Sequence, residues 1–280
     1  MAGGGSDLTD FEAWCGKHGV PTTIEAITKE VAGRYVSQEL VSKKIHWATG
    51  NRKITACSAY WRWLMKRTAV SVNPWSGQSL SKVGKAKNGD RPKRPFSDDE
   101  VRSLLAGRAD PELADVMRVA ALSGMRLEEI YRLTAADCAG GWFAVNQSKT
   151  DAGVRRVPIH PALEAIVARR CHGKRDTAYL FPEAGEAKEG RERSAAVSKR
   201  FGRYRQTVGV HDRAKGKRHS RVDFHSWRRW FITTARNAGI DRAVVAATVG
   251  HEAGNLTDDV YSRVAGAALV ACVAAVQLPL

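Results

Sequence analysis

Residues 123–130 read Ser-Gly-Met-Arg-Leu-Glu-Glu-Ile, a sequence that predicts a tight turn followed at once by a helix. Gly124 suits the turn because glycine adopts backbone angles that other residues avoid. The helix then carries Arg126 in its first turn, where a planar guanidinium can meet a phosphate beside the positive end of the helix dipole. Many helices begin with an arginine, so this motif predicts a phosphate site only together with others.

A second motif, further along the chain, is Phe-His-Ser-Trp-Arg-Arg at residues 224–229. His225 and Arg228 are three residues apart, so in a helix they project from the same face. A protonatable imidazole beside a permanent cation suits phosphoryl transfer, which needs both proton transfer and charge neutralisation. An isolated pair of this kind is also common on protein surfaces.

Two further segments supply reactive side chains. Val-Gly-His at residues 249–251 follows a short predicted helix, and Tyr261 comes ten residues after His251. Between residues 142 and 159 the pattern changes to two short apolar runs around Asp-Ala-Gly, which predicts a β-hairpin with Lys149 in its turn.

The order and spacing of these residues resemble the active-site signature of the tyrosine recombinases, over about residues 97–265. The matching positions are Arg126, Lys149, His225, Arg228, His251 and Tyr261. The chain departs from the usual pattern in two places: Arg229 stands where many relatives have histidine, and Val249 replaces the leucine of Leu-Gly-His. Neither departure removes a catalytic group.

The resemblance implies that Tyr261 attacks a DNA phosphodiester and leaves a 3′-phosphotyrosine and a free 5′-hydroxyl. A phenol with a pKa of about 10 needs a base, and His225 resembles that base. Lys149 resembles the acid that protonates the departing 5′-oxygen. The phosphotyrosyl bond conserves the energy of the broken bond, so rejoining is expected to need no ATP.

The resemblance also assigns the groups that hold the phosphate. Arg126 and Arg228 look like the clamp for its non-bridging oxygens, with His251 as a further hydrogen-bond donor. Glu129, one turn beyond Arg126, resembles a residue that orients an arginine or a histidine; an ordinary surface glutamate is the alternative. No cofactor and no metal site are expected.

Composition points to a polyanionic partner. The net charge is +16, with +6 in residues 1–90 and +10 in residues 91–280, so both parts of the chain can attract phosphates. Nucleic acid is the first candidate, an anionic membrane surface the second, and a basic protein tuned for solubility the alternative. The five cysteines lack a C-x-x-C pair, which fits a reducing cytosol, and no signal peptide or membrane span is predicted.

Residues 7–75 are predicted to form a helical unit that resembles the core-binding domain of the same family. Its last helix, near residues 54–68, carries Tyr60, Trp61 and Trp63, which we expect in the core rather than as platforms for DNA bases. The basic residues around these aromatic ones are the predicted DNA contacts, namely Arg62, Lys66 and Arg67.

Residues 76–95 are predicted to be an interdomain linker because they are rich in Gly, Ser, Asn, Pro and cations. The linker is predicted to lie along the DNA backbone, with a merely solvated segment as the alternative; the residues concerned are Lys82, Lys85, Lys87, Lys93 and Arg94. A second basic loop adds Lys217, Arg218 and Arg221.

Residues 96–280 form the predicted catalytic domain. Ser97 and Glu100 have the spacing of a capping box at its first helix. The expected fold is mainly α with a small β-hairpin, in two domains that form a clamp around DNA. The apolar segment of about residues 264–280 packs either into its own domain or, as in the recombinases that the chain resembles, onto a neighbouring subunit of a tetramer on paired sites.

These inferences together predict a cytoplasmic, nucleoid-associated, site-specific recombinase that acts on double-stranded DNA through a Holliday junction. A type IB topoisomerase, a telomere resolvase and a catalytically silent DNA-binding regulator are the alternatives. A directionality factor is left open as a further partner. Integrases that also bind arm-type DNA sites usually have a further N-terminal domain, for which this chain has no room, so we expect either a simpler recombinase or a truncated one.

Overall fold

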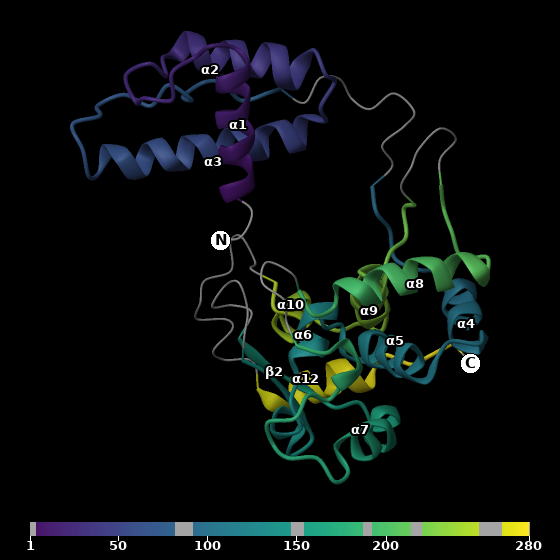
Figure 1. Ribbon diagram of the computed structural model, residues 1–280. Coiled ribbons are helices and arrows are strands. Elements are labelled where there is room, and N and C mark those ends of the chain that lie inside the picture. Colours follow the sequence, from purple (N-terminus) through teal and green to yellow (C-terminus); the bar gives the residue numbers. More distant parts are fainter. Residues whose placement is uncertain are drawn as a thin grey trace. The chain divides into compact units, whose positions relative to one another are not determined.

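The computed structural model describes residues 4–81, 92–146, 154–186, 192–213, 220–251 and 265–279. The chain divides into two compact units, residues 1–88 and 89–280, and each has a hydrophobic core of its own. In the first unit the helices of the described residues are α1 (Gly4–Lys17), α2 (Lys29–Tyr35), the π-helical turn η1 (Val36–Val41) and α3 (Trp47–Met65) (Figure 1).

Aromatic rings fill the core of the first unit. Phe11 meets Trp75 and Tyr35 edge to face, with ring centroids 4.8 and 5.0 Å apart. Edge-to-face pairs match the positive rim of one ring to the negative face of the other, which stabilises a small core beyond the area that it buries. Trp75, at the end of the predicted helical unit, is therefore a core residue.

Helix α3 differs from the prediction in its start and in two of its aromatic residues. It begins at Trp47 rather than near residue 54, and its Gly50 lets Leu80 approach closely, since a Cβ there would lie 2.5 Å from Leu80 Cδ1. Trp61 is buried as expected, but Tyr60 and Trp63 are exposed. Their rings stack on the outer face of the helix, 6.2 Å apart.

Both ends of the predicted linker are built into the two units. Near its start, the side-chain amide of Asn51 exchanges two hydrogen bonds with the backbone of Leu80, at 2.7 and 2.9 Å. Near its end, Lys93 donates to the carbonyl of Ser220 at 2.7 Å. The segment that joins the units is thus shorter than residues 76–95, and residues 82–91 lie outside the described residues.

In its described residues the second unit is mainly helical with one two-stranded antiparallel sheet, which confirms the predicted mainly α fold with a small β-hairpin. Its longer elements are α4 (Asp98–Ala106), α5 (Pro111–Ser123), α6 (Leu127–Arg132), β1 (Trp142–Val145), β2 (Arg155–Pro158), α7 (Glu164–Cys171), α8 (Ala195–Thr207), α9 (Ser226–Asn237), α10 (Arg242–Val249) and α12 (Gly266–Ala274). Single 3₁₀ turns lie at Ala136–Cys138, Pro161–Leu163 and Pro182–Ala184.

Helix α5 runs through the core of this unit and packs on α9. The predicted hairpin is confirmed: β1 pairs with β2 in a register that sets Trp142 opposite Pro158 and Val145 opposite Arg155. The predicted capping box at α4 is also present, since Ser97 Oγ accepts from the Glu100 amide at 3.2 Å and the Glu100 carboxylate accepts from the Ser97 amide at 2.8 Å.

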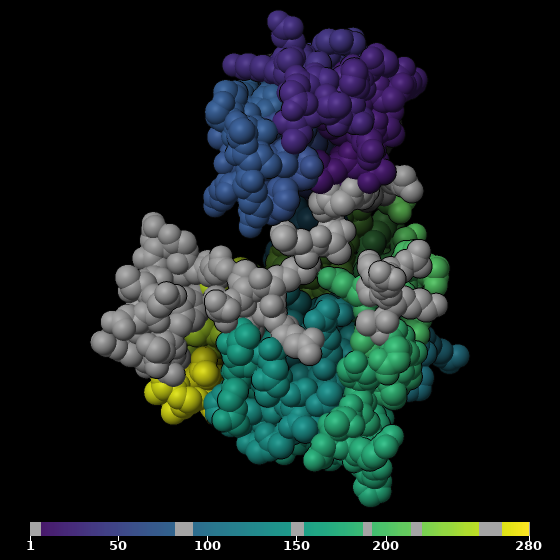
Figure 2. Space-filling view, turned by 60° about the vertical axis from the view of Figure 1, so that its left-hand side comes forward, coloured from purple at the N-terminus to yellow at the C-terminus, as the bar shows by residue number. Residues whose placement is uncertain are grey.

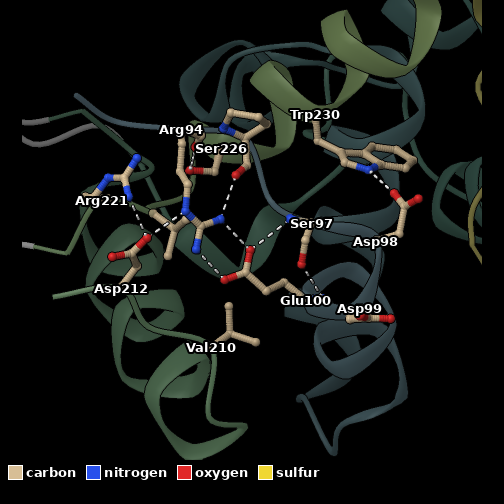
Figure 3. A network of polar contacts seen from close by, with 12 residues as sticks. Arg94, Ser97, Asp98, Asp99, Glu100, Val210, Asp212, Arg221, Ser226 and Trp230 are labelled. Carbon is tan, nitrogen blue, oxygen red and sulfur yellow. Dashed lines mark hydrogen bonds and ion pairs between the residues drawn. The ribbon is translucent and has the colours of Figure 1, made fainter. Parts of the chain in front are cut away.

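Arg94 joins the end of the linker to the body of the second unit (Figure 3). Its guanidinium donates to both carboxylate oxygens of Glu100, at 2.7 and 2.8 Å, and to Asp212 at 2.7 Å. Its backbone carbonyl accepts from Ser226 Oγ at 2.8 Å. The hydrogen bonds to Glu100 and Asp212 raise the pKa of Arg94 above its ordinary value. Ser226 is the first residue of α9, so the linker ends directly on that helix.

Helix α12 packs on its own unit through one face. Cys272, Val273 and Val276 are buried in the core, and the helix contacts α10 and β2. Other side chains of the helix are exposed and apolar, among them Val270, which is 47% exposed. Atoms of the C-terminal segment lie at the surface in Figure 2 (yellow). In the single chain the helix packs within its own domain, and its placement on a neighbouring subunit stays a prediction.

Candidate active site

The turn between α5 and α6 delivers Arg126. Gly124 ends α5 with a φ of 63°, and a Cβ there would lie 2.7 Å from Phe231 Cδ1, so both the backbone angle and the packing require glycine. Arg126 follows as the N-cap residue, directly before α6, and keeps 40% of its side chain exposed. The sequence thus folds here as its Gly-Met-Arg motif predicts.

Arg228 lies on α9 and is 1% exposed. Its Nη1 donates to the carbonyl of Gly124 at 2.9 Å, but its Nε and Nη2 have no hydrogen-bond partner within the described residues. Burial, and then the charge of Arg126, lower its pKa to about 9, so it stays cationic at neutral pH. A buried cation with two spare donors is suited to an anion that accepts from both.

Glu129 is a buried carboxylate that binds two arginines of the site, Arg126 and Arg155. Its Oε1 accepts from Arg126 Nη1 at 2.6 Å, and its Oε2 accepts from Arg155 Nη2 at 2.9 Å. Burial alone would raise the pKa of Glu129, but the hydrogen bonds and charges of Arg155 and Arg126 outweigh it and lower that pKa. The alternative of a surface glutamate is excluded, because its side chain is only 6% exposed.

Two histidines border the arginines. His225 directly precedes α9 and keeps exposed surface, yet desolvation, followed by the charges of Arg229 and Arg228, lowers its pKa to about 4. His251 follows Gly250 at the end of α10, and desolvation, followed by Arg228 and Arg126, lowers its pKa as well. Without a bound anion, His225 is therefore a neutral imidazole at neutral pH.

The structure thus brings together five of the predicted site residues, which come from the starts of α6 and α9 and from the end of α10 (Figure 1). They are Arg126, Glu129, His225, Arg228 and His251. Arg126 Nη2 also lies 3.4 Å from the carbonyl of Gly250, which ties the first arginine to the turn before His251. A cavity of about 820 Å³ opens beside them, lined in part by Arg126, Glu129 and His225.

The other two predicted catalytic residues, Lys149 and Tyr261, lie outside the described residues. The same holds for five of the predicted DNA contacts, Lys82, Lys85, Lys87, Lys217 and Arg218. Arg62 on α3 and Lys66 and Arg67 directly after it are exposed, and the guanidinium of Arg67 lies over the ring of Trp63 at 4.8 Å.

The remaining predicted DNA contacts are held by carboxylates of their own unit. Arg94 is bound by Glu100 and Asp212 as described above, Arg221 lies 3.2 Å from Asp212, and Lys93 lies 3.0 Å from Asp223. Composition identified these cations but not the carboxylates that approach from distant parts of the chain. The side chain of Arg94 thus fastens the linker to the second unit, and its contact with DNA stays a prediction.

Sequence reasoning missed Arg155, whose side chain is 7% exposed and binds Glu129. Residues two apart in a strand share a face, and Val157, two residues on, is fully buried. That alternation is the signal that could have distinguished the inward Arg155 from its neighbour Arg156, which lies over the ring of Trp142.

Neither a metal centre nor a membrane span is seen in the described parts of the chain. No three His, Cys, Asp or Glu side chains gather there closely enough to hold a metal ion. None of the helices described is both long enough and apolar enough to cross a bilayer.

Comparison with solved structures supports the fold. The integrase from mycobacterium phage Brujita is similar over 98% of this chain and 84% of its own, at 22% identity and a TM-score of 0.52. A lambda integrase dimer bound to a COC′ core site is similar over 91% and 71%, at 20% identity and a TM-score of 0.59. The Tn1549 transposon integrase in complex with transposon right end DNA is similar over 89% and 85%, at 18% identity and a TM-score of 0.59.

Comparison of sequences gives the family. A search among curated protein sequences finds no significant match. The sequence does match the phage integrase family over residues 94–267, which is more than half of the chain and includes every residue of the candidate site. With that match and the shared fold, this chain belongs to the phage integrase family.

Proposed function

We propose that this protein is a site-specific DNA recombinase that cleaves and rejoins strands through a covalent bond between Tyr261 and a 3′-phosphate. The observation that carries the proposal is the buried guanidinium of Arg228, which has two nitrogens without an acceptor in the described chain, beside Arg126 and two histidines with lowered pKa values. A tetrahedral oxyanion such as a phosphodiester would accept from both arginines at once.

The chemistry balances with the groups that the chain provides. The Tyr261 oxygen forms a bond to phosphorus, the bond from phosphorus to the 5′-oxygen breaks, and Lys149 protonates that oxygen. The phenolic proton passes to His225. Arg126, Arg228 and His251 stabilise the added charge on the non-bridging oxygens. In the reverse step a 5′-hydroxyl attacks the phosphotyrosine, so a strand exchanged between two duplexes is joined without ATP.

Double-stranded DNA is the proposed substrate. The net charge of +16 favours a polyanion, and α3 with the two residues after it contains cations but no Asp or Glu. Of those cations, Arg52 and Lys53 pair with Asp7 and Asp10, while the later three, Arg62, Lys66 and Arg67, are exposed. Several solved relatives, lambda and Tn1549 integrases among them, are complexes with DNA. We therefore propose that the two units clamp a duplex between them.

A covalent adduct tests the nucleophile. Tyr261→Phe should abolish the adduct on a nicked substrate that cannot religate, while its affinity for DNA stays within about threefold, because only the attacking oxygen is lost. Denaturing gel electrophoresis of protein and labelled DNA gives the readout. An adduct that persists in this variant would place the nucleophile elsewhere, with Tyr204 examined first.

An assay for joining of strands between two DNA molecules distinguishes a recombinase from a topoisomerase and from a silent regulator. Strands joined between two different duplexes identify a recombinase, whereas relaxation of supercoils without such joining identifies a topoisomerase. DNA binding by the wild type without any adduct would identify a silent regulator and overturn the proposal.

The role of Lys149 is tested by the leaving group. Lys149→Ala should slow cleavage of an ordinary substrate by roughly a hundredfold, as loss of a general acid commonly does. A substrate with sulfur in place of the bridging 5′-oxygen should restore most of the rate, because a thiolate leaves without a proton. Equal impairment on both substrates, measured as single-turnover rates, would show that Lys149 only positions DNA.

The pKa of His225, the proposed base, tests the electrostatics of the site. In the free protein His225 should titrate near its pKa of about 4, and binding of DNA by Tyr261→Phe should raise that pKa because the phosphate offsets Arg228 and Arg229. Arg229→Gln should raise it without DNA, and Arg236→Gln, at the far end of α9, should not. NMR titration of the ring protons measures both effects.

The lowered pKa of His225 also determines how the stability of the folded chain depends on pH. A histidine with a depressed pKa stabilises the folded chain above its unfolded pKa of about 6.5 and loses this contribution as the pH falls toward 4. A His225 pKa that stays fixed when DNA binds would remove this residue from the role of base.

We further propose assembly into a tetramer that processes a Holliday junction, with α12 passing between subunits. A lambda integrase tetramer bound to a Holliday junction has the same fold. The exposed apolar face of α12 fits a neighbouring subunit, and its buried face contacts its own core when the chain is single. A directionality factor would be revealed by the assay for joining between two duplexes, if its addition changes which sites are joined.

Val270→Gln tests this face without changing charge. It should leave binding to a single site unchanged and weaken synaptic complexes about tenfold, the effect of losing about 1.4 kcal/mol from an interface. Val41→Gln, at an exposed valine of the other unit, is the matched control. Gel shifts with one and two sites give the comparison, and normal synapsis by Val270→Gln would exclude this face from the interface.

A further inference from the structure

We propose that Arg155 is a positioning residue, which fixes Arg126 and the turn before His251 in one rigid arrangement; this proposal rests on the proposed function. No role was assigned to Arg155 from the sequence. It is the first residue of β2, and its side chain points into the unit on the same face as Val157.

The guanidinium of Arg155 joins three elements. Its Nη2 and Nη1 donate to the two oxygens of Glu129 on α6, at 2.9 and 3.3 Å. Its Nε donates to the carbonyl of Thr248 near the end of α10, at 2.9 Å. Carbonyls in the last turn of a helix have no partner within the helix, and a cation there also meets the negative end of the dipole. One side chain thus links β2, α6 and α10.

Gly250 shows how closely Arg155 approaches the turn that presents His251. Gly250 has a φ of 66°, and a Cβ on it would lie 2.8 Å from Arg155 Nη1 and 3.0 Å from Cδ and Cζ. The glycine of the Val-Gly-His motif is therefore required both by its backbone angle and by the flat guanidinium packed against it. Its carbonyl in turn faces Arg126 Nη2.

Glu129 carries the influence of Arg155 to Arg126. The same carboxylate that Arg155 holds by two donors accepts from both the backbone amide and the Nη1 of Arg126. A glutamate with only Arg126 as partner could rotate with that half-exposed side chain. Fixed by Arg155, it presents Arg126 in one orientation, and a preorganised donor is worth more than a mobile one in a transition state.

Arginine is required for this role because the contacts point in two directions. Two donors of the fork meet a carboxylate while Nε meets a carbonyl, and a lysine ammonium offers one point of charge at the end of a flexible chain. The side chain is buried and its donors face protein groups, so it acts through Arg126 and His251 rather than by touching DNA. Its charge also contributes to the lowered pKa of His251.

The experiment compares four variants of the full chain. Arg155→Met removes the fork, and Arg155→Lys keeps charge and length. Arg156→Met is the matched control on the same strand, because that side chain is exposed and lies over Trp142. Arg170→Met controls for lost stability, since it breaks another buried ion pair of this unit, to Asp115 at 2.6 Å, outside the site.

We expect Arg155→Met and Arg155→Lys each to slow single-turnover cleavage at saturating DNA by about 10- to 100-fold, the effect of misplacing a catalytic group by about 1 Å. Their affinity for DNA should stay within about threefold of wild type. Arg156→Met should cleave normally, and Arg170→Met should do so at a temperature where it is folded. Full activity of Arg155→Lys, or an equal defect in Arg170→Met, would overturn the proposal.

A second readout needs no catalysis. NMR titration of the DNA-free protein should show that the pKa of His251 rises in Arg155→Met and stays unchanged in Arg156→Met and Arg170→Met. If His251 responds in this way but the wild type forms no adduct with any DNA, the proposed function fails and the positioning contact stands. If the adduct forms and His251 does not respond, Arg155 is not its positioning residue.

Discussion

Arg228 is almost wholly withdrawn from water, and among the described residues only the carbonyl of Gly124 accepts one of its N–H groups. Each unsatisfied buried donor costs about 1–3 kcal/mol, so the folded chain stores an unfavourable energy at this position. A bound phosphate relieves it by supplying the missing acceptors. The rest of the site follows from this constraint. The neighbouring groups have to offset the buried charge of Arg228 without accepting the hydrogen bonds of its two unpaired nitrogens.

The neighbours meet that requirement in different ways. Glu129 supplies negative charge, but its oxygens are occupied by Arg126 and Arg155 and do not compete for Arg228. Both histidines have lowered pKa values, so His225 at least adds no further positive charge at neutral pH. The turn at Gly124 serves two purposes, since its backbone aims Arg126 and its carbonyl anchors Arg228. The apo site is therefore prepared electrostatically for a ligand with negative charge.

Local signals in the sequence were sufficient for much of this arrangement. The capping box at Ser97, the turn at Gly124 and the shared face of His225 and Arg228 depend on residues within a few positions of one another. The hairpin was likewise predicted from its own two apolar runs and the turn residues between them. Helical phase would also have revealed the exposed Tyr60 and Trp63, because the buried stripe of α3 runs through Ile54, Cys57, Trp61 and Leu64.

Several of the contacts that sequence reasoning did not find join distant segments. Arg155 meets a carboxylate 26 positions before it and a carbonyl 93 positions after it. Arg94 meets Asp212, 118 positions away. Composition predicts that such arginines are basic and near DNA-binding segments, but it cannot predict which of them tertiary packing will pair with acids. Tyr261 and Lys149 stay predictions, since they lie outside the described residues.

The way the linker ends has a mechanical consequence. The carbonyl of Arg94 accepts from Ser226, two residues before Arg228, and its guanidinium is held by carboxylates on α4 and on the loop before Ser220. Tension on the chain ahead of Pro92 therefore reaches the first turn of α9 across several bonds that share the force in parallel. A force that arrives at Pro92 is therefore not absorbed at this end of the linker and is passed to the helix that carries Arg228.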